Sequence, residues 1–340
     1  MQFSTSSLDL DPAKETERIV QFLQQYLRQT KRRGAVVGIS GGVDSAVVLA
    51  LCVRAFGAAR VMAIMMPDKD SDPLSEKLAR ELASTFGVTP QLEDITGALD
   101  GFGCYRRRDD AIRRVVPDYD PVSGFKAKIV LPQDLLDAGT LNVFSLTIVR
   151  PDGQEETHPL APREMLEIIA ASNLKQRARM SVLYLHAETR QYAVIGTANK
   201  NEHAQGFFVK HGDGGVDIQA LAHLFKTQVY QLARHLGVPV AIQKRTPTTD
   251  TYSAPSSQEE FFFRLPFATL DLIWFAMEHQ VPAAEVGVVM GLSQTQVQRV
   301  FDDLRRKQRT TEFLRDAAPM LDAPMMAEGE HASLLRDTRG

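Results

Sequence analysis

The segment 40–45 (SGGVDS) constrains this chain more than any other, because of the residues on either side of it. The preceding run 34–39 (GAVVGI) is short, apolar and β-branched, which predicts a buried parallel strand. The following run from Val43 predicts a helix that ends at Gly57. A strand, a glycine-bearing loop and a helix N-terminus direct free backbone N–H groups and the positive end of the helix dipole at an anion.

The residue types in this loop favour a nucleotide. The adjacent glycines Gly41 and Gly42 let the backbone approach a ligand closely, and Asp44 in the first helical turn adds a carboxylate that suits Mg²⁺. The dinucleotide fingerprint is absent because it requires separated glycines, and the Walker motif is absent because no lysine follows. A tight turn with Ser40 as a helix cap is the alternative, but a cap requires fewer of these residues.

Composition describes an ordinary globular protein. The chain has 340 residues, 44% of them hydrophobic, and 39 basic residues against 42 acidic ones, so its charge gives no reason to expect a nucleic-acid or membrane partner. Residues 1–11 lack the basic start and apolar centre of a signal peptide. The two cysteines, Cys52 and Cys104, do not form a disulfide framework. We therefore expect a cytoplasmic protein.

Strand and helix patterns alternate through the first hundred residues. A helix is predicted over 11–31, a strand over 60–67, a helix over 71–86 and a third strand over 88–95. This alternation predicts an α/β fold with a doubly wound parallel sheet, which binds ligands beyond the carboxyl ends of its strands. We assign residues 1–100 and 163–252 to this core.

The other segments differ in pattern. Residues 101–162 break the alternation with a hairpin and two arginine clusters (Arg106–Arg108, Arg113 and Arg114), which predicts an inserted subdomain. The arginines either clamp a second phosphate or form a solvated face. Residues 253–318 are predicted to be a helical extension, and 319–340 have the composition of a disordered tail. Within the extension, 281–305 has the pattern of a helix-turn-helix, which leaves a DNA-binding or regulatory module as an alternative function. Its second helix lacks the basic patch that DNA binding requires.

A second group of polar residues follows another buried strand at 192–197 (YAVIGT). This strand leads into Glu202, and a loop with Lys210 and Asp213 precedes a helix that begins near Lys226. Because carboxyl ends of parallel strands share one edge of the sheet, we expect Glu202 to approach Asp44. Two carboxylates and phosphate oxygens are a common set of Mg²⁺ ligands.

Four sequence blocks, together with SGGVDS, identify a family. These are NLKQRARM (173–180), VIGTANKNE (194–202), FFVKHGDGGVD (207–217) and LFKTQVYQLARHLGVP (224–239). SGGVDS resembles the pyrophosphate loop of the N-type ATP pyrophosphatases, and the whole set resembles the ammonia-dependent NAD⁺ synthetase family. The resemblance implies adenylation of the nicotinate carboxylate of deamido-NAD by ATP and Mg²⁺, after which ammonia displaces AMP.

The resemblance also implies roles for individual residues. Asp44 and Glu202 would bind Mg²⁺, and Asp44, Lys210 and Lys226 would act in catalysis. ATP would contact Ser40, Gly41, Gly42, Asp44, Ser45, Thr197 and Lys226, and deamido-NAD would contact Arg177, Arg179, Phe208, Lys210 and Asp213. Such a site keeps water away from the adenylate and needs no covalent protein nucleophile.

The chain departs from the family pattern in three places. The insertion at 101–162 is unusual, the segment after Asp250 is aromatic rather than acidic, and 307–311 (KQRTT) replaces a basic His-Lys-Arg loop. A paralogue that amidates a different carboxylic acid therefore stays open as an alternative. No glutaminase motif is present, so we expect ammonia from solution or from a separate glutaminase. The resemblance further implies a homodimer.

Overall fold

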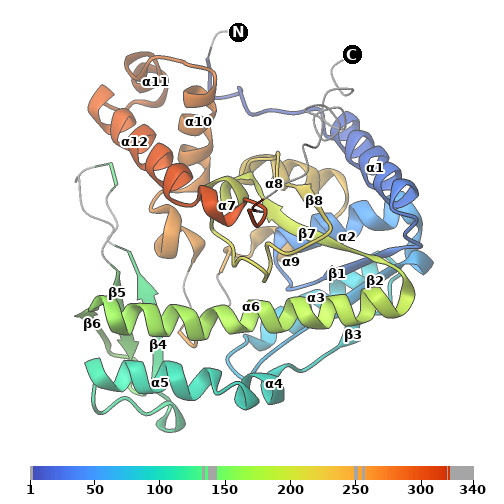
Figure 1. Ribbon diagram of the computed structural model, residues 1–340. Helices are drawn as coiled ribbons and strands as arrows, with labels where there is room; N and C mark the ends of the chain where they lie inside the picture. The colour runs from blue at the N-terminus through green and yellow to red at the C-terminus, as the bar shows by residue number, and fades with distance from the viewer. Residues whose placement is uncertain are drawn as a thin grey trace.

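The computed structural model describes residues 3–131, 135–136, 144–248, 252–254, 257–319 and 321, and the backbone alone of Glu260. A five-stranded parallel sheet in the order β3-β2-β1-β7-β8 lies at its centre (Figure 1). Its strands are β1 (Ala35–Gly38), β2 (Val61–Met65), β3 (Gln91–Leu92), β7 (Ala193–Asn199) and β8 (Ile218–Leu221). The chain passes from β1 outward to β2 on one side and returns at β7 on the other, which places the topological switch point between β1 and β7.

Helices cover both faces of this sheet. One face packs against α1 (Pro12–Gln29), α2 (Val43–Phe56), α3 (Pro73–Thr85) and α8 (Lys226–His235), and the other packs against the long helix α6 (Pro162–Arg190). Successive residues of β1 therefore enter different cores: Ala35 and Val37 lie with α1 and α2, whereas Val36 lies with α6. Burial on both faces explains why these strands are continuous apolar runs in the sequence.

A second, antiparallel sheet lies within the segment predicted as an insertion. It consists of β4 (Lys126–Val130), β5 (Ser145–Val149) and β6 (Glu155–Pro159), in that order. The predicted hairpin is confirmed, since Val149 pairs with Glu155 across the turn. α4 (Thr96–Gly101) and α5 (Cys104–Val115) lie on the same side of the molecule, and α5 packs along α6 (Figure 1). Apolar residues of α5, the small sheet and α6 form a separate small core.

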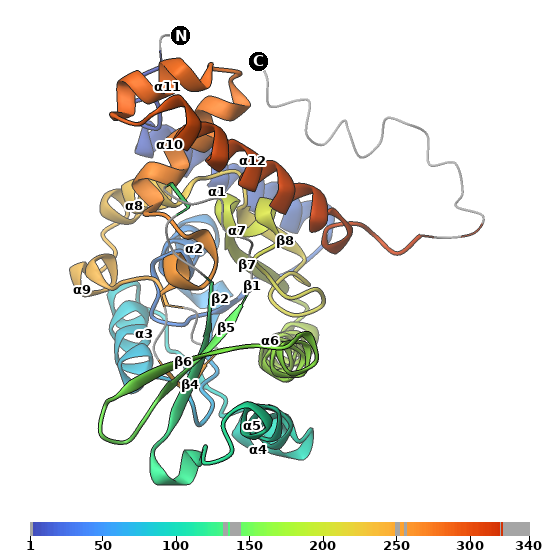
Figure 2. The same ribbon diagram turned by 90° about the vertical axis from the view of Figure 1, so that its left-hand side faces the viewer.

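The C-terminal helices lie at the end of the molecule opposite the small sheet (Figure 2). They are α10 (Phe267–Glu278), α11 (Ala283–Met290) and α12 (Gln294–Thr310), and they follow a π-helical turn at Glu259–Phe263. α11 and α12 form the predicted helix-turn-helix, with Gly291 in the left-handed conformation between them. Residues of both helices belong to the same apolar core as the buried Trp274 of α10, so this pair is part of a core. No helix in the described ranges is long and apolar enough to cross a membrane.

The prediction of an α/β doubly wound sheet is confirmed, and one strand is shorter than expected. The strand predicted over 88–95 is limited to Gln91–Leu92, which pair with Ile64 and Met65. Pro90 has no N–H to donate to a ladder, and Asp94 turns away to accept a hydrogen bond from the Thr96 amide at 2.8 Å. Of the predicted tail 319–340, the structure describes only 319 and 321.

Candidate active site

A cavity of about 420 Å³ lies at the carboxyl ends of β1, β2 and β7. This is the edge of the sheet where ligands bind in doubly wound folds. Residues from the pyrophosphate-like loop, from the segment after β2 and from the segment after β7 all line it, although they are far apart in the sequence. The predicted site residues that line it are Ser40, Gly42, Asp44, Ser45, Arg179, Thr197, Glu202, Asp213 and Lys226.

The loop between β1 and α2 has the geometry of an anion cradle. Gly41 has a φ of +73°, and a Cβ at this position would lie 2.6 Å from the carbonyl oxygen of Ser75. Glycine is therefore required here for both conformation and space. Ser45 holds the loop closed, because its Oγ donates to the Gly42 carbonyl at 3.0 Å and accepts from the Ser40 amide at 3.3 Å. No side chain caps α2 at Gly42, so the first-turn amides stay available to a ligand.

Asp44 meets a buried cation at the mouth of this loop. Its carboxylate forms an ion pair with the Nζ of Lys226 and accepts a hydrogen bond from the Asn199 Nδ2 at 2.9 Å. Lys226 is the first residue of α8 and is completely buried. Burial alone would lower its pKa, but the carboxylates of Asp44 and Glu202 raise the pKa above its ordinary value. Lys226 is therefore a permanent positive charge inside the site.

Glu202 is the second carboxylate of the site. α7 (Lys200–Gln205) begins with a capping box in which Asn199 and Glu202 exchange hydrogen bonds of 3.1 Å. The other Glu202 oxygen accepts from the Gln258 Nε2 at 2.9 Å. Burial, and then the negative charge of Asp44, raises the Glu202 pKa from 4.5 to about 8. A carboxyl group with this pKa is one that a bound cation would stabilise in its ionised form.

Asp213 and Arg179 complete the predicted part of the cavity wall. The Asp213 Oδ1 accepts from the Val209 amide at 2.8 Å, and burial raises the pKa of Asp213 to about 6. Arg179 extends from α6, donates from Nε to the carbonyl oxygen of Met66 at 3.1 Å and forms an ion pair with Asp68 at 3.1 Å. Its guanidinium is thus held at the edge of the cavity.

Four predicted residues do not line the cavity. Gly41 packs beneath the loop against α3. Arg177 donates to the carbonyl oxygen of Lys210 at 3.3 Å, and the Lys210 amine donates to the carbonyl oxygen of Phe313 at 2.8 Å and to that of Asp316 at 3.2 Å. Phe208 lines a separate cavity of about 160 Å³. The roles of Arg177, Phe208 and Lys210 stay predictions.

Three further residues form or support the site and were not among the predicted site residues. Arg245 lines the cavity beside the loop, and its guanidinium donates to the Ser75 Oγ at 2.8 Å. Asn199 orients both Asp44 and Glu202. Asp271, on α10, accepts from the Asn201 Nδ2 at 2.6 Å and from the Thr227 amide at 2.9 Å, which fixes the starts of α7 and α8. A signal for Arg245 was its position just before Thr246-Pro247-Thr248, but nothing in the sequence singled out Asp271.

The arginines of α5 pair with carboxylates of the protein itself. Arg108 is buried against Asp70 and Asp109, and Arg114 reaches Glu164 and Glu167 on α6. Arg106 and Arg113 both lie near Asp110. None of these arginines lines the cavity. The structure therefore favours a structural role, in which they fix α5 in place, and gives no support to the predicted phosphate clamp.

Fold and site together define an α/β nucleotide-binding protein with its phosphate loop at the switch point of a parallel sheet. A sequence model of the family described as NAD synthase matches residues 15–113 and 151–315. Proteins named NH3-dependent NAD⁺ synthetase are similar over most of their length. One from Rhizobium meliloti is 46% identical over 95% of this chain and 96% of its own length. One from Thermotoga neapolitana is 37% identical over 77% of this chain and 83% of its own length. The chain belongs to the NAD synthase family.

Solved structures agree on the fold. The NH3-dependent NAD synthetase of Campylobacter jejuni, solved with a nitrate ion, superposes with a TM-score of 0.59 at 20% identity and covers 92% of this chain and 100% of its own. NMN synthetase from Francisella tularensis superposes with a TM-score of 0.58 at 20% identity and covers 93% of this chain and 100% of its own.

The family match and the sequence relatives confirm the prediction of an ATP-dependent, amide-forming ligase of this family. The DNA-binding module and the paralogue with a different acid gain no support.

Proposed function

We propose that the cavity binds ATP with Mg²⁺ beside the nicotinate carboxylate of deamido-NAD and converts the acid to NAD⁺. The carboxylate oxygen attacks the α-phosphorus of ATP, and pyrophosphate leaves. Ammonia then attacks the acyl carbon of the adenylate, AMP leaves, and the nitrogen loses a proton. The names of the two relatives compared by sequence support this assignment, since both are called NH3-dependent NAD⁺ synthetase.

One observation carries the proposal. Asp44, Lys226 and Glu202 come from three separate helices and converge at the loop that is built to bind phosphate. A carboxylate that attacks a triphosphate is repelled by its charge, and a fixed ammonium and a metal ion cancel this repulsion without rearranging during the reaction. Placing both reactants in one cavity also orients the attack along the line of the leaving pyrophosphate.

The residues present fit a Mg²⁺ ion. Asp44 and Glu202 offer hard carboxylate oxygens, and phosphate oxygens supply the remaining ligands in sites of this kind. The raised pKa of Glu202 is consistent with this role, because burial and the charge of Asp44 disfavour the ionised carboxylate and a bound cation would stabilise it. When bound, Mg²⁺ would neutralise charge on the phosphates and favour the departure of pyrophosphate.

The test is an assay with purified protein, ATP, Mg²⁺, ammonium and deamido-NAD, in which AMP and NAD⁺ are both quantified. We expect equal amounts of the two products. A parallel series replaces deamido-NAD with other carboxylic acids, and AMP formation with one of those acids alone would contradict the proposed substrate. Glu202→Gln, which keeps the size of the side chain and an oxygen for the capping box, should lose Mg²⁺-dependent AMP formation and keep the fold.

The proposed partners are ammonia and a second copy of the chain. Ammonia would come from solution or from a separate glutaminase, and glutamine alone should then fail to replace ammonium in the assay. The homodimer is proposed from the resemblance of the sequence to the family. Sedimentation velocity would detect the dimer.

We also propose that the chain is divided into a core, a subdomain at 101–162 and a helical extension at 253–318.

A further inference from the structure

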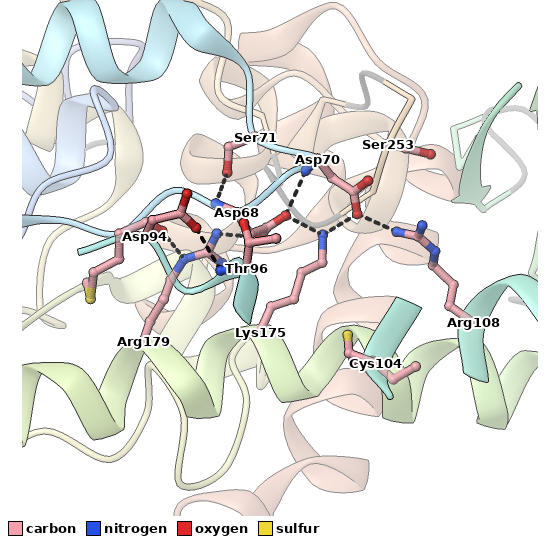
Figure 3. A network of polar contacts seen from close by, with 12 residues as sticks. Asp68, Asp70, Ser71, Asp94, Thr96, Cys104, Arg108, Lys175, Arg179 and Ser253 are labelled. Atoms are coloured by element: carbon pink, nitrogen blue, oxygen red, sulfur yellow. Dashed lines mark hydrogen bonds and ion pairs between the residues drawn. The ribbon is translucent and has the colours of Figure 1, made fainter. Parts of the chain in front are cut away.

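A cluster of paired charged side chains lies behind one wall of the cavity (Figure 3). Lys175 of α6 is completely buried, and its Nζ lies 3.1 Å from Asp68 Oδ1 and 2.7 Å from Asp70 Oδ2. Asp70 also pairs with the buried Arg108 of α5, and Asp68 pairs with Arg179 of α6 at 3.1 Å. The cluster therefore joins the segment after β2 to two helices.

Both oxygens of Asp68 are occupied within the protein. Oδ1 accepts from Lys175 and, at 2.8 Å, from the Asp70 amide, while Oδ2 accepts from Arg179. Asp68 thus holds three other groups of the protein in place. Burial would raise the pKa of Asp70, but Arg108 and Lys175 keep it below its ordinary value. The carboxylates of the cluster are matched by cations, which is the condition for burying them at low cost.

Only part of the cluster reaches the cavity. Arg179 and Asp68 line it, whereas Lys175, Asp70 and Arg108 do not. Nε of Arg179 is bound to the Met66 carbonyl oxygen and its NH2 is bound to Asp68, so two sides of the guanidinium are fixed. Its NH1 makes no hydrogen bond within the described ranges of the chain. A guanidinium anchored in this way loses little entropy when NH1 binds a phosphate or a ribose hydroxyl.

We propose that Asp68 is a positioning residue that acts through Arg179 to set the affinity of the cavity for an adenine nucleotide. Arg179 contacts the phosphate or ribose of the nucleotide, and Asp68, itself fixed by Lys175, holds the guanidinium in the binding orientation. This proposal rests on the proposed function only in that the cavity binds a nucleotide. It requires neither adenylation nor a particular acid.

The test is a double-mutant cycle on the full chain with Asp68→Asn, Arg179→Met and the double variant. Calorimetry measures the dissociation constants of two probes: α,β-methylene-ATP, which cannot be cleaved at the α–β linkage, and deamido-NAD. We expect D68N and R179M each to weaken one probe by about tenfold. We expect D68N to have no further effect when Met replaces Arg179. The probe that responds shows which nucleotide Arg179 contacts.

Two outcomes overturn the proposal: unchanged affinity for both probes in D68N, or effects of D68N and R179M that multiply in the double variant. Arg114→Met is the matched control, because it removes a pair that joins the same two helices away from the cavity and should leave both affinities unchanged. If D68N does not fold, Asp70→Asn loosens the same cluster from its far side and should weaken binding only while Arg179 is present. Absence of NAD⁺ formation would refute the proposed function and leave these binding results intact.

Discussion

Replacement of Lys226 by methionine tests the central ion pair of the site. Methionine keeps most of the length of the side chain and removes the charge. In the metal-free protein, burial and Asp44 raise the Glu202 pKa to about 8, which disfavours the ionised form of this carboxyl group at pH 7. The Lys226 ammonium is therefore balanced chiefly by Asp44, with which it forms an ion pair. K226M leaves the partly buried Asp44 carboxylate without a cation.

The expected loss of stability in K226M follows from the burial of the ion pair between Lys226 and Asp44. Removing one partner of a buried ion pair costs about 3–5 kcal/mol, because the remaining charge stays desolvated. We expect K226M to lower the free energy of unfolding by about this amount. The turnover of ATP to AMP should fall by at least about 100-fold, since the variant also loses a fixed positive charge at the phosphates.

A second substitution shows whether the loss of stability in K226M comes from the unpaired Asp44 charge. Asp44→Asn removes the unmatched charge and keeps an oxygen for the hydrogen bond from Asn199. The variant D44N/K226M should therefore be more stable than K226M, although it carries one more substitution and is equally inactive. Urea unfolding in the presence of EDTA measures all three proteins. If the double variant is no more stable than K226M, the Asp44 carboxylate and the Lys226 ammonium do not neutralise each other in the way described here.

Three further predictions concern single residues of the site. Gly41→Ala should destabilise the protein by about 1–3 kcal/mol and abolish ATP turnover, since it adds a clash with Ser75 to an unfavourable φ. Gly291→Ala, at a left-handed position with open space around it, is its control and should cost less. Arg245→Met should raise the KM for ATP about tenfold, and a change in thermal stability without a change in KM would contradict contact with the nucleotide. Burial raises the Asp213 pKa from 3.8 to about 6, so the folded state keeps a proton that the unfolded state has released. The free energy of unfolding should therefore fall as pH rises through this window, by at most about 3 kcal/mol relative to Asp213→Asn, and parallel pH profiles of the two proteins would refute the assignment.

Much of the fold could be predicted because its signals are local. The strand at β1, the capped helix α3 and the hairpin of β5 and β6 each follow from a few neighbouring residues. The strand after Phe86 is shorter than predicted, because Pro90 cannot donate to a ladder and Asp94 accepts a hydrogen bond from the Thr96 amide instead of continuing the strand. The arginine-rich helix α5 was ambiguous in the sequence, since its pairing with carboxylates of α6 and of the segment after β2 depends on tertiary contacts.

The candidate site divides in the same way. The loop with Gly41 and the carboxylate of Asp44 were evident from the sequence, since a strand, two glycines and a helix N-terminus form an anion site by local geometry. Membership in the NAD synthase family also follows from sequence, through blocks that occur in a fixed order. The tertiary structure alone decided that Lys226 is buried against Asp44 and that Asp68, Lys175 and Arg179 form one cluster. These pairings join segments more than a hundred residues apart, and only the packing of helices against the sheet brings such charges together and removes the water that would separate them.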